Sequence, residues 1–304
     1  MKLCIASGKG GAGKTTVTAS LAHVWPTPVL AADLDAEAPN LHLFLHPQLR
    51  HEEQVNLTVP RLNPERCTHC GACRDICRYN AIARFAGRVS FFTDMCHGCG
   101  GCFAVCPAHA LEEDGRALGS LLDGEFAGGR FIMGKSRIGE AMTPPLLRRL
   151  LAAVDTLLDA EAADALMDAP PGVSCPAMTA ARGADAVLLV AEPTPFGLHD
   201  FQLACDAFAR LSLPAAVVLN RAGQDKDCDA AVTALCAERG LPVLGALPFD
   251  ADAARAYAAG KLVAETSPIW RTRFEDLGVR LRHFLEQCAE QHGTETHAQE
   301  ADHV

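Results

Sequence analysis

The sequence lacks the features that mark several classes of protein. It carries 27 basic against 37 acidic side chains, a formal net charge of −10, so no basic surplus is available for nucleic acid or anionic lipid. No apolar run approaches the roughly 18 residues that cross a bilayer, and the N-terminus lacks the apolar stretch of a signal peptide. We therefore expect a cytoplasmic chain with no membrane anchor and no nucleic-acid partner.

Cysteine, in contrast, is abundant. Eight of the 14 cysteines fall between Cys67 and Cys106, and the other six are scattered among apolar residues. Disulfides are rare in a reducing compartment, so the dense group predicts metal binding. The scattered cysteines are expected to pack as small apolar side chains.

Short apolar runs alternate with amphipathic stretches along most of the chain. This alternation predicts an α/β fold with a doubly wound, mostly parallel sheet covered by helices on both faces. Strands are expected at 2–7, 28–33, 164–168, 185–191, 215–220 and 242–247, and helices at 14–24, 144–160, 197–211, 227–239 and 268–288.

Residues 60–113 interrupt this pattern with an internal repeat. The run CTHCGACRDICRYNAI returns 29 residues later as CHGCGGCFAVCPAHAL. A hairpin turning at Ala127–Gly129 is expected to lead back into the main fold. The predicted domains are the first part of an α/β domain (1–59), a small α+β insertion (60–113), the second part of the α/β domain (114–290) and a disordered polar tail (291–304).

The segment from Gly8 to Thr15 fits the pattern G-x-x-x-x-G-K-[ST] between a predicted strand and a predicted helix. Its backbone N–H groups would surround phosphate at a helix N-terminus, whose dipole favours anions. Lys14 would reach the β- and γ-phosphates of a nucleotide and Thr15 would bind Mg²⁺. The nucleotide-binding residues expected here are Gly8, Lys9, Gly10, Gly11, Ala12, Gly13, Lys14, Thr15 and Thr16.

Such a loop needs a carboxylate on a neighbouring strand to hold the magnesium ion. Asp168 ends the strand ADALMD and is expected to bind Mg²⁺ with Thr15. Asp33 and Asp35 end the second strand, at the edge of the sheet where ligands bind in such folds. One of them could orient the attacking water, whereas Asp33 is equally suited to an ordinary strand-end or capping role.

With Lys9, the loop resembles the deviant Walker A motif of the MinD/ParA/Mrp ATPases and the nitrogenase iron protein. Asp168-Ala-Pro-Pro-Gly is similar to the switch II of that class, and Asp35 lies where the class has its switch I aspartate. The resemblance implies an ATPase that forms ADP and phosphate. It also implies a homodimer enclosing nucleotide, or a heterodimer with a paralogue, in which Lys9 reaches the partner's phosphates. Segments similar to the adenine contacts of the class are Asn220, Arg221, Pro248, Phe249 and Asp250.

The spacing C-x₂-C-x₂-C-x₃-C occurs twice in the insertion. In bacterial two-cluster ferredoxins the fourth cysteine of each run binds the other [4Fe–4S] cluster. The expected ligands are therefore Cys67, Cys70, Cys73 and Cys106 for one cluster, and Cys77, Cys96, Cys99 and Cys102 for the second. A pair of zinc sites is the alternative, although zinc modules usually separate two C-x₂-C pairs by a longer gap. Arg78 departs from the ferredoxin pattern, which has proline after the fourth cysteine, and could raise one reduction potential.

Cys175 follows Asp168 by seven residues and resembles in position a ligand of an intersubunit cluster in the nitrogenase iron protein. The second such cysteine is missing near Glu140, so a packing role is the alternative. The predicted cofactors are ATP, Mg²⁺ and two [4Fe–4S] clusters.

Three functions remain open from the sequence. The first is an ATPase that couples its nucleotide state to electron transfer through the clusters, toward an unidentified redox client. The second is a carrier that assembles or hands on iron–sulfur clusters, as Mrp-type relatives do. The third is a spatial regulator like MinD, which would need a basic amphipathic C-terminal helix. The acidic end of the chain disfavours it.

Overall fold

A computed structural model describes residues 1–26, 28–161 and 164–301, without the side chains of Glu161 and of residues 291–301. The chain divides into two compact units. The first comprises residues 1–52, 121–135 and 147–304, and the second comprises 53–120 and 136–146. The tail expected to be disordered, 291–304, lies largely outside the described side chains. Within the described residues, no helix is both long and apolar enough to cross a membrane.

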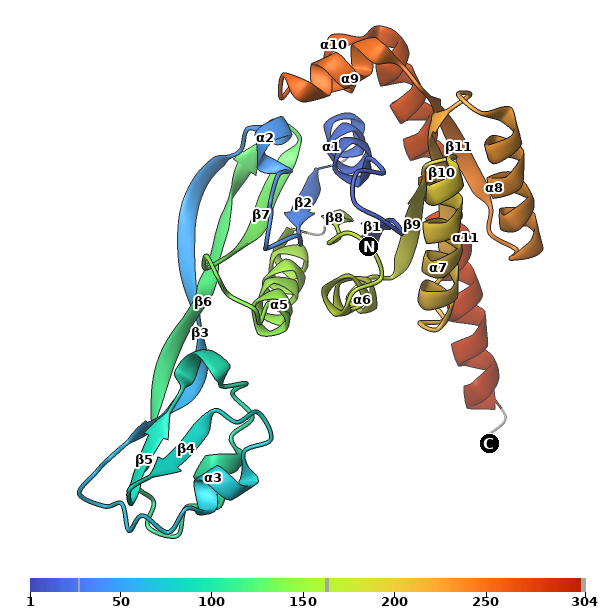
Figure 1. Cartoon of the computed structure of the whole chain (residues 1–304). Coiled ribbons are helices and arrows are strands. Elements are labelled where there is room, and N and C mark those ends of the chain that lie inside the picture. Colours follow the sequence, from blue (N-terminus) through green and yellow to red (C-terminus); the bar gives the residue numbers. More distant parts are fainter. Residues whose placement is uncertain (27, 162–163, 302–304) are drawn as a thin grey trace. The chain divides into compact units, whose positions relative to one another are not determined.

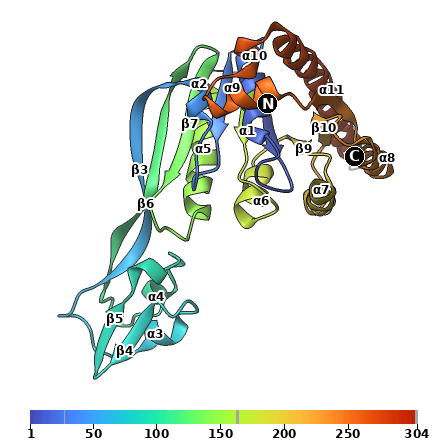
Figure 2. The same ribbon diagram turned by 45° about the horizontal axis from the view of Figure 1, so that its top comes forward.

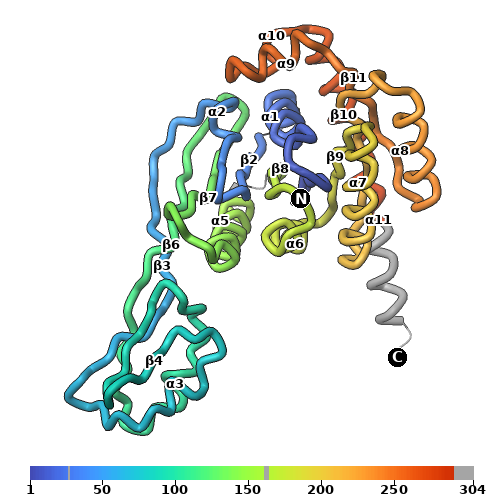
Figure 3. The backbone as a smooth tube through the Cα atoms, in the orientation of Figure 1, coloured from blue at the N-terminus to red at the C-terminus, as the bar shows by residue number. Residues whose placement is uncertain are grey.

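The first unit is built on parallel strands. The order of the described sheet is β11-β10-β9-β1-β8-β2-β7-β6-β3, and the pairs from β11 through β7 are all parallel (Figure 1). The first strand of the chain lies near the middle of the sheet, between β8 and β9 (Figure 3). The parallel strands are β1 (Lys2–Ala6), β2 (Val29–Asp33), β7 (Gly129–Ser136), β8 (Asp164–Asp168), β9 (Ala186–Ala191), β10 (Ala215–Ala222) and β11 (Val243–Pro248).

Helices cover both faces of this sheet, as the sequence pattern predicts (Figure 2). One face packs against α1 (Lys14–Val24), α10 (Val263–Thr266) and α11 (Pro268–Ala301). The other face packs against α5 (Pro144–Glu161), α6 (Cys175–Arg182), α7 (Pro195–Ala209) and α8 (Lys226–Glu238). Two further short helices, α2 (His42–Leu45) and α9 (Ala251–Ala258), follow the ends of β2 and β11. The six predicted strands and five predicted helices are confirmed. Their ends agree within about two residues, except that α11 continues well beyond residue 288 into the segment expected to be a disordered tail.

Several elements were not predicted from the sequence. The longest is β3 (Gln48–Leu62), which contains Pro60, where the sequence suggested a boundary. It carries charged residues at its start instead of alternating apolar ones, so it gives no strand signal. Helices α6, α9 and α10 were also missed. The expected hairpin is present, with β6 (Leu111–Phe126) and β7 joined at Ala127 and Gly128.

The second unit contains the cysteine repeat. Its other elements are α3 (Ala72–Ile76), an antiparallel hairpin of β4 (Ile82–Phe85) and β5 (Arg88–Phe91), a 3₁₀ turn (Thr93–Met95) and α4 (Gly101–Ala104). Ala86 and Gly87 form the hairpin turn with positive φ angles of 47° and 74°. Positive φ at both turn residues matches the right-handed twist of paired strands. Ile82 and Val89 of the hairpin pack with Cys102 in a small core of their own.

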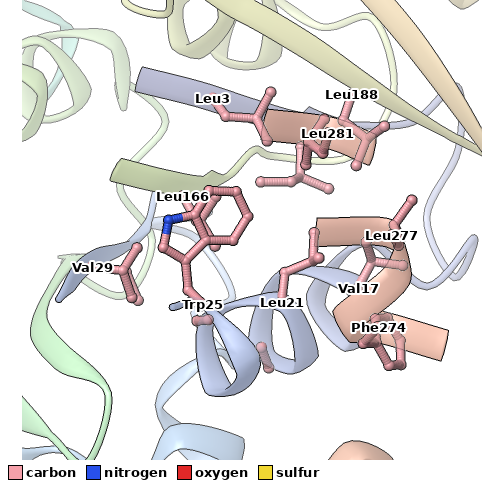
Figure 4. Close-up of a cluster of buried hydrophobic side chains, with 14 of the residues drawn as sticks. Leu3, Val17, Leu21, Trp25, Val29, Leu166, Leu188, Phe274, Leu277 and Leu281 are labelled. Atoms are coloured by element: carbon pink, nitrogen blue, oxygen red, sulfur yellow. The ribbon is translucent and has the colours of Figure 1, made fainter. Parts of the chain in front are cut away.

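The core of the first unit depends on contacts between α1 and α11. Leu21 and Val17 of α1 face Phe274 and Leu277 of α11, over sheet residues such as Leu166 (Figure 4). Phe274 is fully buried. This packing fixes α1, and therefore the loop that precedes it, against the sheet.

Replacing Phe274 with alanine should destabilise the protein by about 3–5 kcal/mol, because it removes a buried ring and leaves a cavity. Denaturant unfolding followed by circular dichroism would measure the loss. Val279→Ala is the matched control on the same helix, where the side chain is 57% exposed, and it should change stability by less than about 0.5 kcal/mol. Equal effects of the two substitutions would contradict this account of the core.

Candidate functional site

The glycine-rich loop lies between β1 and α1, as its sequence predicts. Gly13 precedes α1 with φ of 96°, a conformation that favours glycine. A Cβ at Gly13 would also lie 2.1 Å from the Asn220 side-chain nitrogen. That nitrogen donates a hydrogen bond to the Ala12 carbonyl over 2.8 Å. The end of β10 therefore holds the loop in place, and only glycine fits beside it.

Lys14 lies inside the site with little exposure. Its ammonium donates to the Ser7 hydroxyl over 3.0 Å, and the hydroxyl donates to the Lys9 carbonyl over 2.6 Å. Burial lowers the pKa of Lys14, an effect that the nearby charges of Asp168 and Asp35 oppose. The lysine is thus a poorly hydrated cation at the start of a helix, which suits a bound anion.

Asp168 ends β8 and is almost fully buried. Its carboxylate accepts hydrogen bonds from the hydroxyls of Thr15, over 2.6 Å, and Thr18, over 3.2 Å. Burial raises the pKa of Asp168 to about 6, against the lowering effect of Thr15, Lys14 and Thr18. Carboxylate and hydroxyl oxygens are the donors that Mg²⁺ prefers, so Thr15 and Asp168 fit a magnesium ion in donor chemistry.

Asp33 and Asp35, both at the end of β2, have different surroundings. Asp33 is fully buried and accepts backbone N–H bonds from Asp35, Asn40 and Leu41 at 2.9–3.1 Å. Asp33 therefore organises the loop that follows β2. This is the strand-end role considered from the sequence, and not the role of orienting the attacking water. Asp35 instead lines the cavity beside the loop, and burial raises its pKa.

A cavity of about 360 Å³ adjoins these residues in the first unit. It brings together most of the residues singled out from the sequence: Gly10, Gly11, Gly13, Lys14, Thr15, Thr16, Asp35, Asp168, Asn220, Arg221, Pro248, Phe249 and Asp250. Gly8, Lys9 and Ala12 are not part of its lining. A Cβ at Gly8 would meet the backbone of Asp200, which explains the glycine there by packing.

The cavity has further walls that the sequence analysis missed. They are Asn40, Ala169, Pro171, Leu247, Ala253, Ala254, Tyr257, Val263, Trp270 and Phe274. Trp270 donates to the Asp250 carboxylate over 2.8 Å, and Tyr257 stacks on Phe44 with ring centroids 4.9 Å apart. Trp270 lies 20 residues after Asp250, so no local sequence pattern connects the two.

The Lys9 side chain does not line the cavity and pairs with Glu192. Its ammonium lies 2.5 Å from one carboxylate oxygen, and Arg221 lies 2.6 Å from the other. Burial would raise the pKa of Glu192, but Lys9 and Arg221 together hold it below its usual range. Within one chain, the Lys9 side chain is therefore paired with Glu192 and is not part of the cavity lining.

In the second unit, the eight clustered cysteines surround two cavities. Cys67, Cys70, Cys73 and Cys106 line one, and Cys77, Cys96, Cys99 and Cys102 line the other. Each group contains three cysteines of one run and the fourth of the other run. Among the described side chains, no three His, Cys, Asp or Glu groups converge closely enough to hold a single metal ion. Four thiolates around a cavity are the donor set of a [4Fe–4S] cluster.

Cys175 is the first residue of α6 and is exposed, with no second cysteine in the first unit described beside it. Glu140, where a second intersubunit ligand was sought, belongs to the second unit. It is buried there in an ion pair with Arg116, which also donates to the Cys96 carbonyl over 3.5 Å.

Comparisons with known proteins give one match over most of the chain and another over a short segment. The family model described as "CobQ/CobB/MinD/ParA nucleotide binding domain" matches residues 3–263. The uncharacterized protein MJ0578 of Methanocaldococcus jannaschii is 26% identical over 288 residues, covering 94% of this chain and 98% of that protein. Ferredoxin-1 of Chlorobaculum tepidum is 42% identical over 57 residues, 16% of this chain and 89% of the ferredoxin.

Among solved structures, the cell division ATPase MinD of Pyrococcus furiosus has a similar fold. The TM-score is 0.56 at 21% identity, and the alignment covers 93% of this chain and 98% of that one. This likeness concerns the fold of the chain.

Gly13→Ala should destabilise the nucleotide-free protein by about 1–3 kcal/mol, because it forces a side chain into a strained backbone conformation and against Asn220. Thermal unfolding without nucleotide would measure the change. Gly10→Ala is the matched control in the same loop, because its nearest neighbour would be 3.9 Å away. Similar stabilities for the two variants would show that Asn220 does not hold the loop as described.

Proposed function

Because the chain belongs to the CobQ/CobB/MinD/ParA nucleotide-binding domain family, we propose that it binds and hydrolyses ATP and couples its nucleotide state to electron transfer through two [4Fe–4S] clusters. The family match and the phosphate loop support the nucleotide half of this proposal. The match to a ferredoxin and the two groups of four cysteines support the cluster half.

The ATP-binding residues take roles that follow from their positions. Lys14 binds the β- and γ-phosphates, and Thr15 and Asp168 hold Mg²⁺. Asp35 orients the attacking water from the wall of the cavity. Asn220, Arg221 and the Pro248–Asp250 segment contact the adenine, with Trp270 supporting Asp250 from behind.

Lys9 acts in trans in this proposal. Members of the family commonly dimerise, and we infer a nucleotide enclosed between two copies of the chain, or between the chain and a paralogue. Lys9 then exchanges Glu192 of its own chain for the phosphates bound to the partner subunit. A charge supplied by the partner makes hydrolysis depend on dimerisation, as arginine fingers do elsewhere.

The eight cysteines of the second unit are the ligands of the two clusters. When bound, the clusters supply one-electron transfer at low potential. Three apolar side chains of this unit surround the cysteines and limit the access of water to the clusters. They are Ile82, Val89 and Phe91.

The observation that carries the coupling is the path of β7. Its residue Met133 pairs with Asp33 of β2, which in turn pairs with Asp168 of β8, so β7 passes beside the strand ends that carry these two carboxylates. Three residues after Met133, the chain enters the segment 136–146, which belongs to the second unit. There Arg137 donates its backbone N–H to the Leu118 carbonyl over 2.7 Å, and Glu140 pairs with Arg116. Strand β7, the neighbour of the strand that ends at Asp33, therefore continues along the chain into the unit that contains the eight cysteines.

Transfer of clusters to other proteins is the second candidate. Cys70 and Cys99 are exposed, one in each group of four, so an acceptor thiol could reach both sites. Anaerobic mixing with an acceptor lacking its cluster would test this. Transfer faster than spontaneous cluster loss, and accelerated by ATP, would favour the carrier over the electron-transfer protein.

The crossed ligand sets predict an unusual mutational pattern. Anaerobically purified protein should contain about eight iron and eight sulfide per chain. Cys77→Ser should perturb the cluster bound by Cys96, Cys99 and Cys102, although Cys77 is nearer in sequence to the other three cysteines. Cys106→Ser is the matched control and should perturb the other cluster. Electron paramagnetic resonance (EPR) of the reduced variants distinguishes the two, and zinc in place of iron would contradict the assignment.

Linkage gives the direct test of the proposed function. If nucleotide and redox state bias the same equilibrium, oxidised and dithionite-reduced protein should differ in affinity for a non-hydrolysable ATP analogue by about 5- to 150-fold. Lys14→Ala should bind the analogue in neither redox state, whereas Lys9→Ala should bind it normally and fail to hydrolyse ATP.

The coupling itself would be refuted if oxidised and reduced wild-type protein bound the analogue with equal affinity.

A further inference from the structure

The β4–β5 hairpin of the second unit has two contrasting faces. Ile82 and Val89 are buried and pack toward the cysteines, and Val89 lines the cavity of Cys67, Cys70, Cys73 and Cys106. Arg84, Phe85 and Arg88 are exposed at the turn end of the hairpin. Arg84 is opposite Val89 in the strand pair and Phe85 is opposite Arg88, so Arg84 extends from the cysteine side of the hairpin and Phe85 and Arg88 extend from the other side.

Phe85 is unusually exposed for an aromatic residue. Its side chain is 84% accessible, and it stands directly before the two-residue turn, opposite Arg88 across the strand pair. Nothing in the turn requires an aromatic residue, and an exposed ring adds no stability to the fold. Aromatic residues and arginines together are the side chains enriched at the energetic centres of protein interfaces.

The charge around the hairpin differs from that of the chain as a whole. Residues 61–110 contain six arginines, no lysine and three carboxylates, within a chain of net charge −10. Arg61 is paired with Glu112 and Arg74 with Asp75. Arg66, Arg78, Arg84 and Arg88 are exposed and form no ion pair with any carboxylate in the described part of the chain.

One of these arginines lies against the cysteine loop. A Cβ built on Gly71, the residue after Cys70, would be 3.4 Å from the Arg84 guanidinium. Arg84 thus connects the exposed tip to the loop that supplies three of the four cysteines. Thiolate clusters carry negative charge, which would repel an acidic partner, and unpaired arginines at this position offset that charge.

We propose that the exposed turn end of the β4–β5 hairpin, formed by Arg84, Phe85 and Arg88, is the docking surface for an acidic electron-transfer protein. Phe85 inserts into an apolar recess of the partner, and the two arginines pair with its carboxylates. When bound, the cluster held by Cys67, Cys70, Cys73 and Cys106 would accept one electron from the partner's one-electron redox centre, which is oxidised by one electron in turn. No proton or atom is transferred. The inference rests on the proposed function only in requiring this cluster.

The rest of the chain makes the docking selective. An acidic partner is repelled by the acidic first unit and attracted by the unpaired arginines, so electrostatic steering favours encounter at the hairpin. Such steering is strong at roughly 0.01 M ionic strength, where charges act over about 30 Å, and is lost at about 1 M.

The test uses the full, cluster-loaded, oxidised chain without nucleotide and an oxidised plant-type [2Fe–2S] ferredoxin as the acidic probe. Isothermal titration calorimetry measures binding at low and high ionic strength. Wild-type binding should weaken at least 10-fold with salt, and Arg84→Gln/Arg88→Gln should weaken it by about 10-fold at low salt and remove most of the salt dependence. Phe85→Ala should weaken binding by about 10-fold at both ionic strengths.

The matched control is Arg61→Gln/Arg74→Gln, which removes the same charge from arginines that are already paired. It should bind the probe within about twofold of wild type. Iron content and thermal unfolding of each variant show that the unit remains intact, and Arg84→Lys/Arg88→Lys should restore most of the affinity.

Three results would overturn the proposal. They are no binding of the probe at low salt, equal loss in the test and control variants, and displacement of the probe by single-stranded nucleic acid that binds the same arginines more tightly. Because this binding involves neither ATP nor a change of redox state, it can fail while the linkage between nucleotide and clusters persists, and the reverse is also true.

Discussion

Two buried carboxylates at adjacent strand ends constrain the rest of this protein. Asp33 and Asp168 pair in register at the ends of β2 and β8, and burial raises the pKa of both. Both need hydrogen bonds to remain in so dry a position. Asp33 obtains them from the backbone of the loop that follows β2, and Asp168 from two threonines of α1. Each carboxylate thereby fixes one loop beside the nucleotide site.

The two buried carboxylates also make this edge of the sheet a favourable position for cations. Lys14 is the buried cation whose charge acts on Asp168, and burial lowers its own pKa. A magnesium ion and a nucleoside triphosphate together would complete the charge balance of this edge, since the ion would meet the carboxylate and the phosphates would meet the lysine and the helix N-terminus. In the proposed function, a change in the γ-phosphate would therefore act on the loops after β2 and β8. β7, the neighbour of β2, leads into the unit of the eight cysteines. This is the physical route for the proposed coupling.

The sequence predicted those features that local patterns specify. The phosphate loop, the strands and most of the long helices follow from motif and periodicity, and the confirmed parallel sheet follows from their alternation. Features that depend on distant contacts were missed. Asn220 was singled out only by its resemblance to an adenine contact, and its bond to Ala12 joins residues 208 positions apart. The pairing of Lys9 with Glu192 also joins residues far apart in the sequence, and β3 begins with a charged sequence that lacks strand periodicity. Residues 136–146 belong to the second unit, where Glu140 pairs with Arg116, and these two residues share no sequence motif.

The most direct test of the central claim is a redox titration of the clusters monitored by EPR, with and without a non-hydrolysable ATP analogue and Mg²⁺. Coupling of about 1–3 kcal/mol corresponds to a shift of some tens of millivolts up to roughly 130 mV in at least one potential. The account predicts such a shift for wild-type protein and none for Lys14→Ala. Superimposable titration curves of the wild-type protein in the presence and absence of the analogue would contradict it.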